Sequence, residues 1–142
     1  MRIYLIGSLR NENIPAIAKK LRNAGNEVFD DWFAAGPEAD DYWRKYELER
    51  GHGYIEALQG HAAEHVFSFD KHHLDTSDCA VLVLPAGRSG HLELGYMAGK
   101  GKPAYILLDH SYSEDGRFDV MYKFATAVFD NEDDLIKELK SL

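Results

Sequence analysis

Short apolar runs alternate along the chain with stretches of helical periodicity. The runs predict five strands, at Arg2–Ile6, Glu27–Phe29, Cys79–Leu84, Ala104–Leu108 and Thr126–Phe129. The run at 79–84 is apolar throughout, which is typical of a strand buried on both faces of a parallel sheet. Because helical stretches separate the strands, the pattern predicts an α/β fold, a doubly wound parallel sheet with strand order 2-1-3-4-5.

The helices are predicted from their apolar faces and from their start and stop signals. One helix has Asn13 as its cap and Pro15 in its first turn, and it ends near Gly25. The last helix begins near Asn131 and carries three acidic residues in its first turn, an arrangement that the helix dipole favours. Further helical stretches are expected at about 39–50 and 53–66.

The segment from about residue 30 to residue 77 is long for a simple crossover and is rich in aromatic residues. We expect these aromatic residues to pack this excursion onto the edge of the sheet. The alternative is that some of them stack on a nucleobase. Trp32 and Phe33 are best placed for that role, because they follow the predicted end of strand 2 on the ligand side of the sheet.

Composition narrows the function classes. The chain of 142 residues has the size of one domain, 1–142, and a net charge of -8, which argues against binding to nucleic-acid polymers. Cys79 is the single cysteine and lies in an apolar run, so we expect a buried thiol. The seven histidines have no partners at a recognised zinc spacing, so no metal is expected. We expect a cytoplasmic protein without a membrane segment, since the first apolar stretch is too short for a signal peptide.

Two loops are predicted to meet at the carboxyl edge of the sheet. The switch in strand order lies between strands 1 and 3, so Gly7-Ser8-Leu9-Arg10 should face the stretch from Gly87 to Glu93 across a crevice. A helix N-terminus in such a crevice favours an anion. Glu93, in or near the first turn, would be held charged and placed as a nucleophile or general base. The alternative is an acidic residue that only complements the helix dipole.

Several motifs resemble the nucleoside 2-deoxyribosyltransferase family, which includes the 2'-deoxynucleoside 5'-monophosphate N-hydrolases. They are the opening 3–10 (IYLIGSLR), the pair Asp70 and Asp78 before a buried strand, Glu93-Leu94-Gly95-Tyr96, and Gly101-Lys102-Pro103. The resemblance spans roughly residues 3–108. It implies a flavodoxin-like fold, which agrees with the sheet predicted above.

The resemblance also implies a reaction and assigns residues to it. Glu93 matches the nucleophile that attacks the anomeric carbon of the sugar, and Asp70 matches the acid that assists the departing base. Tyr4 matches an aromatic position beside the nucleophile. Asp78 matches an acidic position at the start of the strand, with a structural role equally open. The resemblance implies no metal or organic cofactor. As in retaining glycosidases, one carboxyl group acts as the nucleophile and the other handles the proton.

The chain departs from the family pattern in places that bear on the substrate. The transferases carry an acid, and the monophosphate hydrolases a serine, six residues before the nucleophile, where this chain has Gly87. The loop Gly7, Ser8 and Arg10 resembles the one that holds a 5'-phosphate in the hydrolases. Arg88 and Ser89 would supply further donors for phosphate or carboxylate.

The resemblance further implies a homodimer or larger homo-oligomer, in which a neighbouring subunit completes the site. Asp119, in the stretch 118–122 (FDVMY), is the candidate for that contribution. The expected ligand is a nucleoside or nucleotide that is either hydrolysed or transferred to a second base. The alternative function is a nucleotide-binding or signalling module without turnover on the same fold. A flavin or dinucleotide protein is not supported, because no GxGxxG follows strand 1.

Overall fold

A single parallel sheet organises the molecule, and its strand order is the predicted one. The computed structural model describes residues 1–109 and 118–142. The strands β1 (Arg2–Ile6), β2 (Glu27–Phe29), β3 (Cys79–Val83), β4 (Ala104–Leu107) and β5 (Ala127–Phe129) form one sheet in the order β2-β1-β3-β4-β5. All four pairings are parallel, with Tyr4 of β1 opposite Phe29 of β2 and Ala80 of β3. The flavodoxin-like α/β prediction is therefore confirmed.

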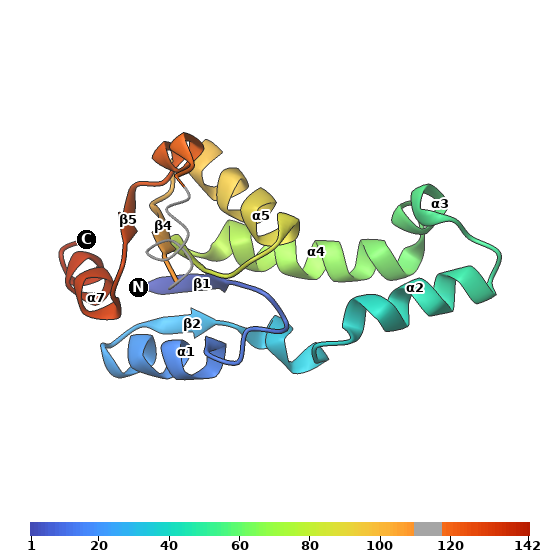
Figure 1. Cartoon of the computed structure of the whole chain (residues 1–142), viewed down its shortest axis with the longest axis horizontal. Coiled ribbons are helices and arrows are strands. Elements are labelled where there is room, and N and C mark those ends of the chain that lie inside the picture. Colours follow the sequence, from blue (N-terminus) through green and yellow to red (C-terminus); the bar gives the residue numbers. More distant parts are fainter. Residues whose placement is uncertain (110–117) are drawn as a thin grey trace.

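Helices cover both faces of this sheet (Figure 1). On one face, α1 (Ile14–Asn23) and α7 (Glu132–Lys140) bury their apolar sides against the strands, with Ile17 and Leu135 among the contacts. On the other face, α5 (Arg88–Gly99) and the end of α4 (His61–Thr76) pack through Leu94 and Leu74. Alternate strand residues divide between the two clusters, as the pleat requires. The thiol of Cys79 is buried as expected, and burial raises its pKa to about 12.

A glycine brings α5 close to the sheet. Gly90 is buried, and a Cβ atom at this position would lie 3.0 Å from Leu82 Cδ1 and 3.1 Å from Ile6 Cγ2. Only a residue without a side chain lets the start of the helix approach β1 and β3 this closely. The first turns of α5 are thus seated directly on the strands whose carboxyl ends form the predicted crevice.

The segment between β2 and β3 forms an arm that extends away from the sheet (Figure 1). It contains the 3-10 helix η1 (Asp31–Ala35), α2 (Ala39–Glu49), α3 (Tyr54–Leu58) and α4. The expected helix at 53–66 is wrong in its bounds, since Gly60 caps a separate helix that runs to Thr76.

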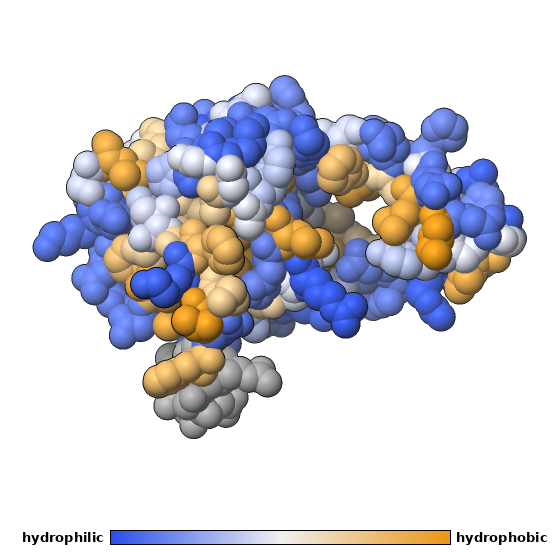
Figure 2. All heavy atoms as spheres, turned by 90° about the horizontal axis from the view of Figure 1, so that it is seen from above, coloured by the Kyte–Doolittle hydropathy of each residue, from blue (hydrophilic) through white to orange (hydrophobic). Residues whose placement is uncertain are grey.

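The arm also differs from the expectation that its aromatic residues pack onto the sheet edge. Tyr42, Tyr54 and Phe67 are 60–68% exposed, and Figure 2 shows apolar side chains at the surface of the arm. Trp32 is an exception, because it packs against both core clusters and donates from its indole Nε1 to the Leu5 carbonyl at 2.7 Å. In the part of the chain that the structure describes, no helix has the length and apolar character needed to cross a membrane.

Candidate active site

Glu93 lies at the centre of the candidate site, in contact with the sheet. It belongs to the second turn of α5, because the helix begins at Arg88, five residues before Glu93. The hydroxyl of Tyr4 donates a hydrogen bond to Glu93 Oε2 at 2.7 Å. Tyr4 lies in β1 and is only 1% exposed, so its ring belongs to the core and its hydroxyl has a fixed position. One carboxylate oxygen of Glu93 is thereby anchored.

The protonation state of Glu93 differs from the one expected from the sequence. Burial raises its pKa, the Tyr4 hydrogen bond lowers it, and the nearby charge of Asp70 raises it, with a net value of about 7 against an ordinary 4.5. The expectation that Glu93 is held fully charged is therefore wrong at neutral pH. The dipole of α5 does not offset burial, because its effect fades beyond the first turn.

Asp70 reaches the same place from another element. It lies on α4, where the helix leaves the sheet, and its burial raises the pKa of its carboxyl. The charge of Asp70 acts on both Glu93 and Tyr4. Burial and the Glu93 carboxylate together raise the pKa of Tyr4 far above its usual range, so this phenol stays a donor. Three elements thus bring together the three predicted catalytic residues.

The loop after β1 lies beside η1 and the base of the arm. A Cβ atom at Gly7 would meet Ile14 Cδ1 at 2.6 Å and the Trp32 ring at 3.6 Å, so this glycine permits a close approach. Ser8 Oγ accepts from the backbone N–H of Arg10 at 3.1 Å. The Arg10 guanidinium is exposed and lies 3.7 Å from the Asp41 carboxylate of α2. Arg10 therefore has an exposed acidic neighbour at the entrance to the arm.

The loop after β3 leads into the first turn of α5. Gly87 is the N-cap, and a Cβ atom added there would meet no neighbour within 4 Å among the described residues. Arg88 and Ser89 follow, and both are exposed. The first turn of α5 therefore presents backbone N–H groups, a guanidinium and a hydroxyl to solvent, which is the chemistry that suits an anion.

Asp78 lies away from this group of residues. It precedes β3, at the opposite edge of the sheet from the loops above, and its carboxylate accepts from the Arg2 backbone N–H at 2.7 Å. That contact joins the starts of β1 and β3. The geometry thus favours the structural role that the sequence left open.

Asp119 and His91 lie near the first turn of α5. Asp119 is the N-cap of the 3-10 helix η2 (Val120–Phe124), and its carboxylate accepts from the Met121 N–H at 2.9 Å. His91 Nδ1 lies 2.8 Å from the Gly87 carbonyl, which requires a donor, so its Nε2 accepts from the Tyr122 hydroxyl at 2.9 Å. This contact holds η2 against α5. No motif in the sequence indicated it.

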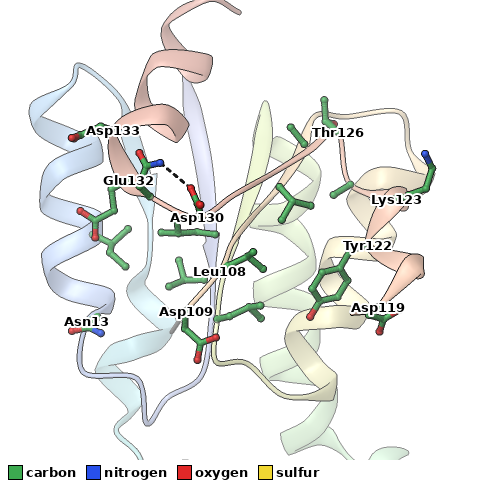
Figure 3. A pocket seen from close by; sticks show the side chains of 18 of the residues that line it. Asn13, Leu108, Asp109, Asp119, Tyr122, Lys123, Thr126, Asp130, Glu132 and Asp133 are labelled. Carbon is green, nitrogen blue, oxygen red and sulfur yellow. Dashed lines mark hydrogen bonds between the residues drawn. The ribbon is translucent and has the colours of Figure 1, made fainter. Parts of the chain in front are cut away.

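A hollow in the described structure lies elsewhere, between α1 and α7 on one side and η2 on the other (Figure 3). It measures about 1150 Å³ and does not include Glu93, Tyr4 or Asp70. Acidic side chains dominate its charged lining: Asp109, Asp119, Asp130, Glu132 and Asp133, against Lys20 and Lys123. Such a lining repels phosphate. We therefore place the candidate site at Glu93.

Comparison with known proteins supports the fold that surrounds this site. No protein-family model matches the chain, and no curated protein matches it. A conserved protein from Enterococcus faecalis V583 has a similar structure, with TM-score 0.65, 16% identity, and coverage of 99% of this chain and 98% of that one.

Two further solved structures carry names that bear on the resemblance. A 2-deoxyribosyltransferase from Bacillus psychrosaccharolyticus has TM-score 0.60 and 20% identity, over 96% of this chain and 90% of that one. The CMP N-glycosidase BcmB from Clostridium botulinum has TM-score 0.52 and 13% identity, over 99% of both chains. The resemblance noted in the sequence is thus confirmed at the level of the fold.

Proposed function

We propose that this protein is an enzyme that cleaves the N-glycosidic bond of a 2'-deoxynucleoside or its 5'-monophosphate through a covalent glycosyl intermediate on Glu93. The observation that carries the proposal is the 2.7 Å hydrogen bond from Tyr4 to Glu93, with the half-buried carboxyl of Asp70 beside both. A module that only binds phosphate has no use for two carboxyl groups in one place. The similar structures named as a deoxyribosyltransferase and an N-glycosidase support this choice of chemistry.

The first step uses Glu93 as the nucleophile. Its free oxygen forms a bond to the anomeric carbon while the bond from that carbon to the base nitrogen breaks, and the electron pair leaves with the base. Tyr4 holds the other oxygen of Glu93 and so aims the free one. Asp70 passes a proton to the departing base, and burial, which raises the pKa of this carboxyl, favours the protonated form that it needs when substrate fills the site. In the second step, water or a second base attacks the same carbon and gives its proton to the Asp70 carboxylate, while the bond from the carbon to Glu93 breaks and frees the carboxylate.

The two loops supply the groups for the polar end of the substrate. Gly7, Ser8 and Arg10 approach from the end of β1, and Gly87, Arg88 and Ser89 approach from the start of α5. Arg10 would exchange its exposed contact with Asp41 for a 5'-phosphate, because a charge-assisted bond to a dianion is stronger than an exposed ion pair at 3.7 Å. These residues therefore favour a monophosphate over an uncharged nucleoside.

The proposed enzyme acts as a homodimer or larger homo-oligomer. Its accessible surface is 9189 Å², whereas a compact monomer of 16.1 kDa exposes only about 7,400 Å². The excess, roughly 1,800 Å², is more than the ~800 Å² that each partner contributes to a standard interface. Exposed apolar side chains on the arm and on η2, such as Phe67 and Phe124, supply the surface for such a contact.

The test of the activity is a chromatographic screen for released base. The protein is incubated with nucleosides, deoxynucleosides and their 5'-monophosphates, each with and without a second free base. Release from monophosphates in water alone indicates a hydrolase, and a new nucleoside formed only with an acceptor base indicates a transferase. In either case Glu93→Gln abolishes turnover, whereas Glu138→Gln on α7 retains it. Ligands that raise the melting temperature without any release of base would refute the proposal and support the binding module.

Subunit sharing of the site has its own test. If Asp119 acts in the partner's site, separate Asp119→Ala and Glu93→Gln proteins are both impaired. Mixing and reassembling the two as dimers leaves one intact site in each mixed dimer, so activity returns to about a quarter of the wild-type value. No recovery in a mixture shown by sedimentation to contain mixed dimers would place Asp119 outside the neighbouring site.

A further inference from the structure

The position of Asp70 depends on how the end of α4 is held. Residues of α4 before Asp70 lie on the arm, and Val66 and Phe67 are exposed. After Asp70, Leu74 is buried against the sheet, and the His73 ring stacks on Phe29 with centroids 3.9 Å apart. These contacts hold α4 to the sheet on the side of β2. Glu93, however, lies on α5, so a separate set of contacts is needed to fix the two helices relative to each other.

Asp75 connects α4 to α5. Its Oδ1 accepts from the Tyr96 hydroxyl and from Lys100 Nζ, the latter at 2.8 Å. Its Oδ2 accepts from Lys71 Nζ at 2.9 Å. These donors hold the pKa of the Asp75 carboxyl well below its usual range, with Lys100 contributing most and then Tyr96 and Lys71. Asp75 is therefore a charged acceptor shared by α4 and α5.

Lys102, just past the end of α5, holds the last turn of α4 by a different contact. Its Nζ donates to three backbone carbonyls at the C-terminal end of α4, those of Asp75 at 2.7 Å, Ser77 at 2.8 Å and Leu74 at 3.3 Å. Carbonyls at a helix end lack partners within the helix and attract a cation. Lys102 is the central residue of the Gly-Lys-Pro motif noted in the sequence, and its ammonium group caps the C-terminal end of α4 from outside that helix.

We propose that Tyr96 and Lys102 are positioning residues, which lock the end of α4 onto α5 and thereby set the placement of Asp70 relative to Glu93. Tyr96 lies three residues after Glu93, on the same side of α5, and Asp75 lies about 7.5 Å along α4 from Asp70 at 1.5 Å per residue. Each carboxyl group of the site is thus within about one and a half helical turns of the contacts that join α4 to α5. The inference rests on the proposed function for its catalytic consequence.

Weakening the contacts between α4 and α5 should change the pKa of Glu93 in a defined direction. If α4 moves away from α5, water reaches Glu93 and the charge of Asp70 recedes. Burial and Asp70 are the two influences that raise the pKa of Glu93, so both changes lower it. A loss of global stability without movement of α4 has no such effect. The titration of Glu93 therefore distinguishes a positioning role from a merely structural one.

The experiment compares Tyr96→Phe and Lys102→Met with two matched controls. Tyr105→Phe removes a buried hydroxyl that has no hydrogen-bond partner within the described chain, on the face opposite α5. Lys19→Met removes an exposed lysine of α1. The Glu93 carboxyl is titrated by infrared difference spectroscopy against Glu93→Gln in each background. Turnover is then measured across pH.

We expect Tyr96→Phe and Lys102→Met to titrate Glu93 at lower pH than wild type and to lower kcat by roughly 10- to 100-fold, with a smaller change in KM. Lys102→Arg restores part of the loss, because its guanidinium still donates to carbonyls, and both controls behave as wild type. An unchanged Glu93 titration in the folded Tyr96→Phe and Lys102→Met proteins would overturn the inference. The titration needs no substrate, so an inactive wild-type protein would refute the proposed function while leaving this test intact.

Discussion

Removing the Tyr4 hydroxyl tests the electrostatics of the site most directly. Tyr4→Phe keeps the buried ring and deletes only the donor that lies 2.7 Å from Glu93 Oε2. A hydrogen bond to a charged group contributes about 1.5–3 kcal/mol. Because this bond stabilises the ionised form of Glu93, its loss raises the pKa of Glu93 from its wild-type value of about 7. A smaller fraction of Glu93, the proposed nucleophile, is then ionised at neutral pH.

The expected loss of activity follows from that free energy. At 1.36 kcal/mol for each tenfold change in the ionisation equilibrium, the ionised fraction of Glu93 at pH 7 falls roughly 7- to 80-fold. The quantity to measure is kcat/KM across pH, which reports the free enzyme. The ratio of wild-type to variant activity should be largest at low pH and shrink as pH rises. A ratio that stays constant across pH would mean that Tyr4 acts without changing the ionisation of Glu93, and would refute the reasoning.

Two predictions concern stability. Because the pKa of folded Glu93 is raised above its ordinary 4.5 to about 7, its contribution to stability is full below pH 4.5 and is lost as pH rises through 7. Between pH 4.5 and pH 7, the free energy of unfolding of Glu93→Gln should therefore rise by up to about 3 kcal/mol relative to that of wild type. Urea unfolding measures this change, and an equal difference between the two proteins at both pH values would contradict it. Gly90→Ala should lower the free energy of unfolding by about 1–3 kcal/mol, because the new Cβ atom would lie 3.0–3.1 Å from Leu82 and Ile6. Gly95→Ala, on the same helix but in open space, should raise it. Equal effects of the two substitutions would show that close approach does not constrain Gly90.

The strands and their order were predictable because each strand is a short apolar run between turn signals. The arm was harder to predict, since a helix that faces no core within its own chain has little reason to show a regular apolar stripe. The helix from 61 to 76 is the example: its first half is exposed, and the predicted helix ended ten residues too early. The aromatic residues of the arm were expected to pack onto the sheet edge, because nothing in the local sequence shows that these helices extend away from the sheet.

The proximity of the candidate site residues could be predicted from the sequence, but their electrostatics could not. Tyr4, Asp70 and Glu93 followed from the family resemblance, and the structure brings them together. The sequence placed Glu93 in or near the first turn of this helix and so under the influence of its dipole, whereas the structure has it in the second turn, on the side that faces the sheet. Lys102 was visible as part of a motif, but its three carbonyl partners come from the end of another helix, which no local pattern reveals.

As the proposed nucleophile, Glu93 meets two conflicting demands, and contacts from several elements of the fold balance them. A nucleophile that attacks a sugar must be ionised, yet a site that excludes water disfavours charge. Burial against the sheet and Asp70 on α4 raise the pKa of Glu93, and Tyr4 on β1 lowers it, so that the carboxyl titrates near neutral pH. Its reactivity is therefore a balance between groups on β1, α4 and α5, and it depends on their relative placement. The hydrogen bonds that join α4 to α5 therefore affect the ionisation of Glu93 as well as the stability of the fold. For this reason we expect substitutions of Tyr96 and Lys102, and not only those of the carboxyl groups, to change activity.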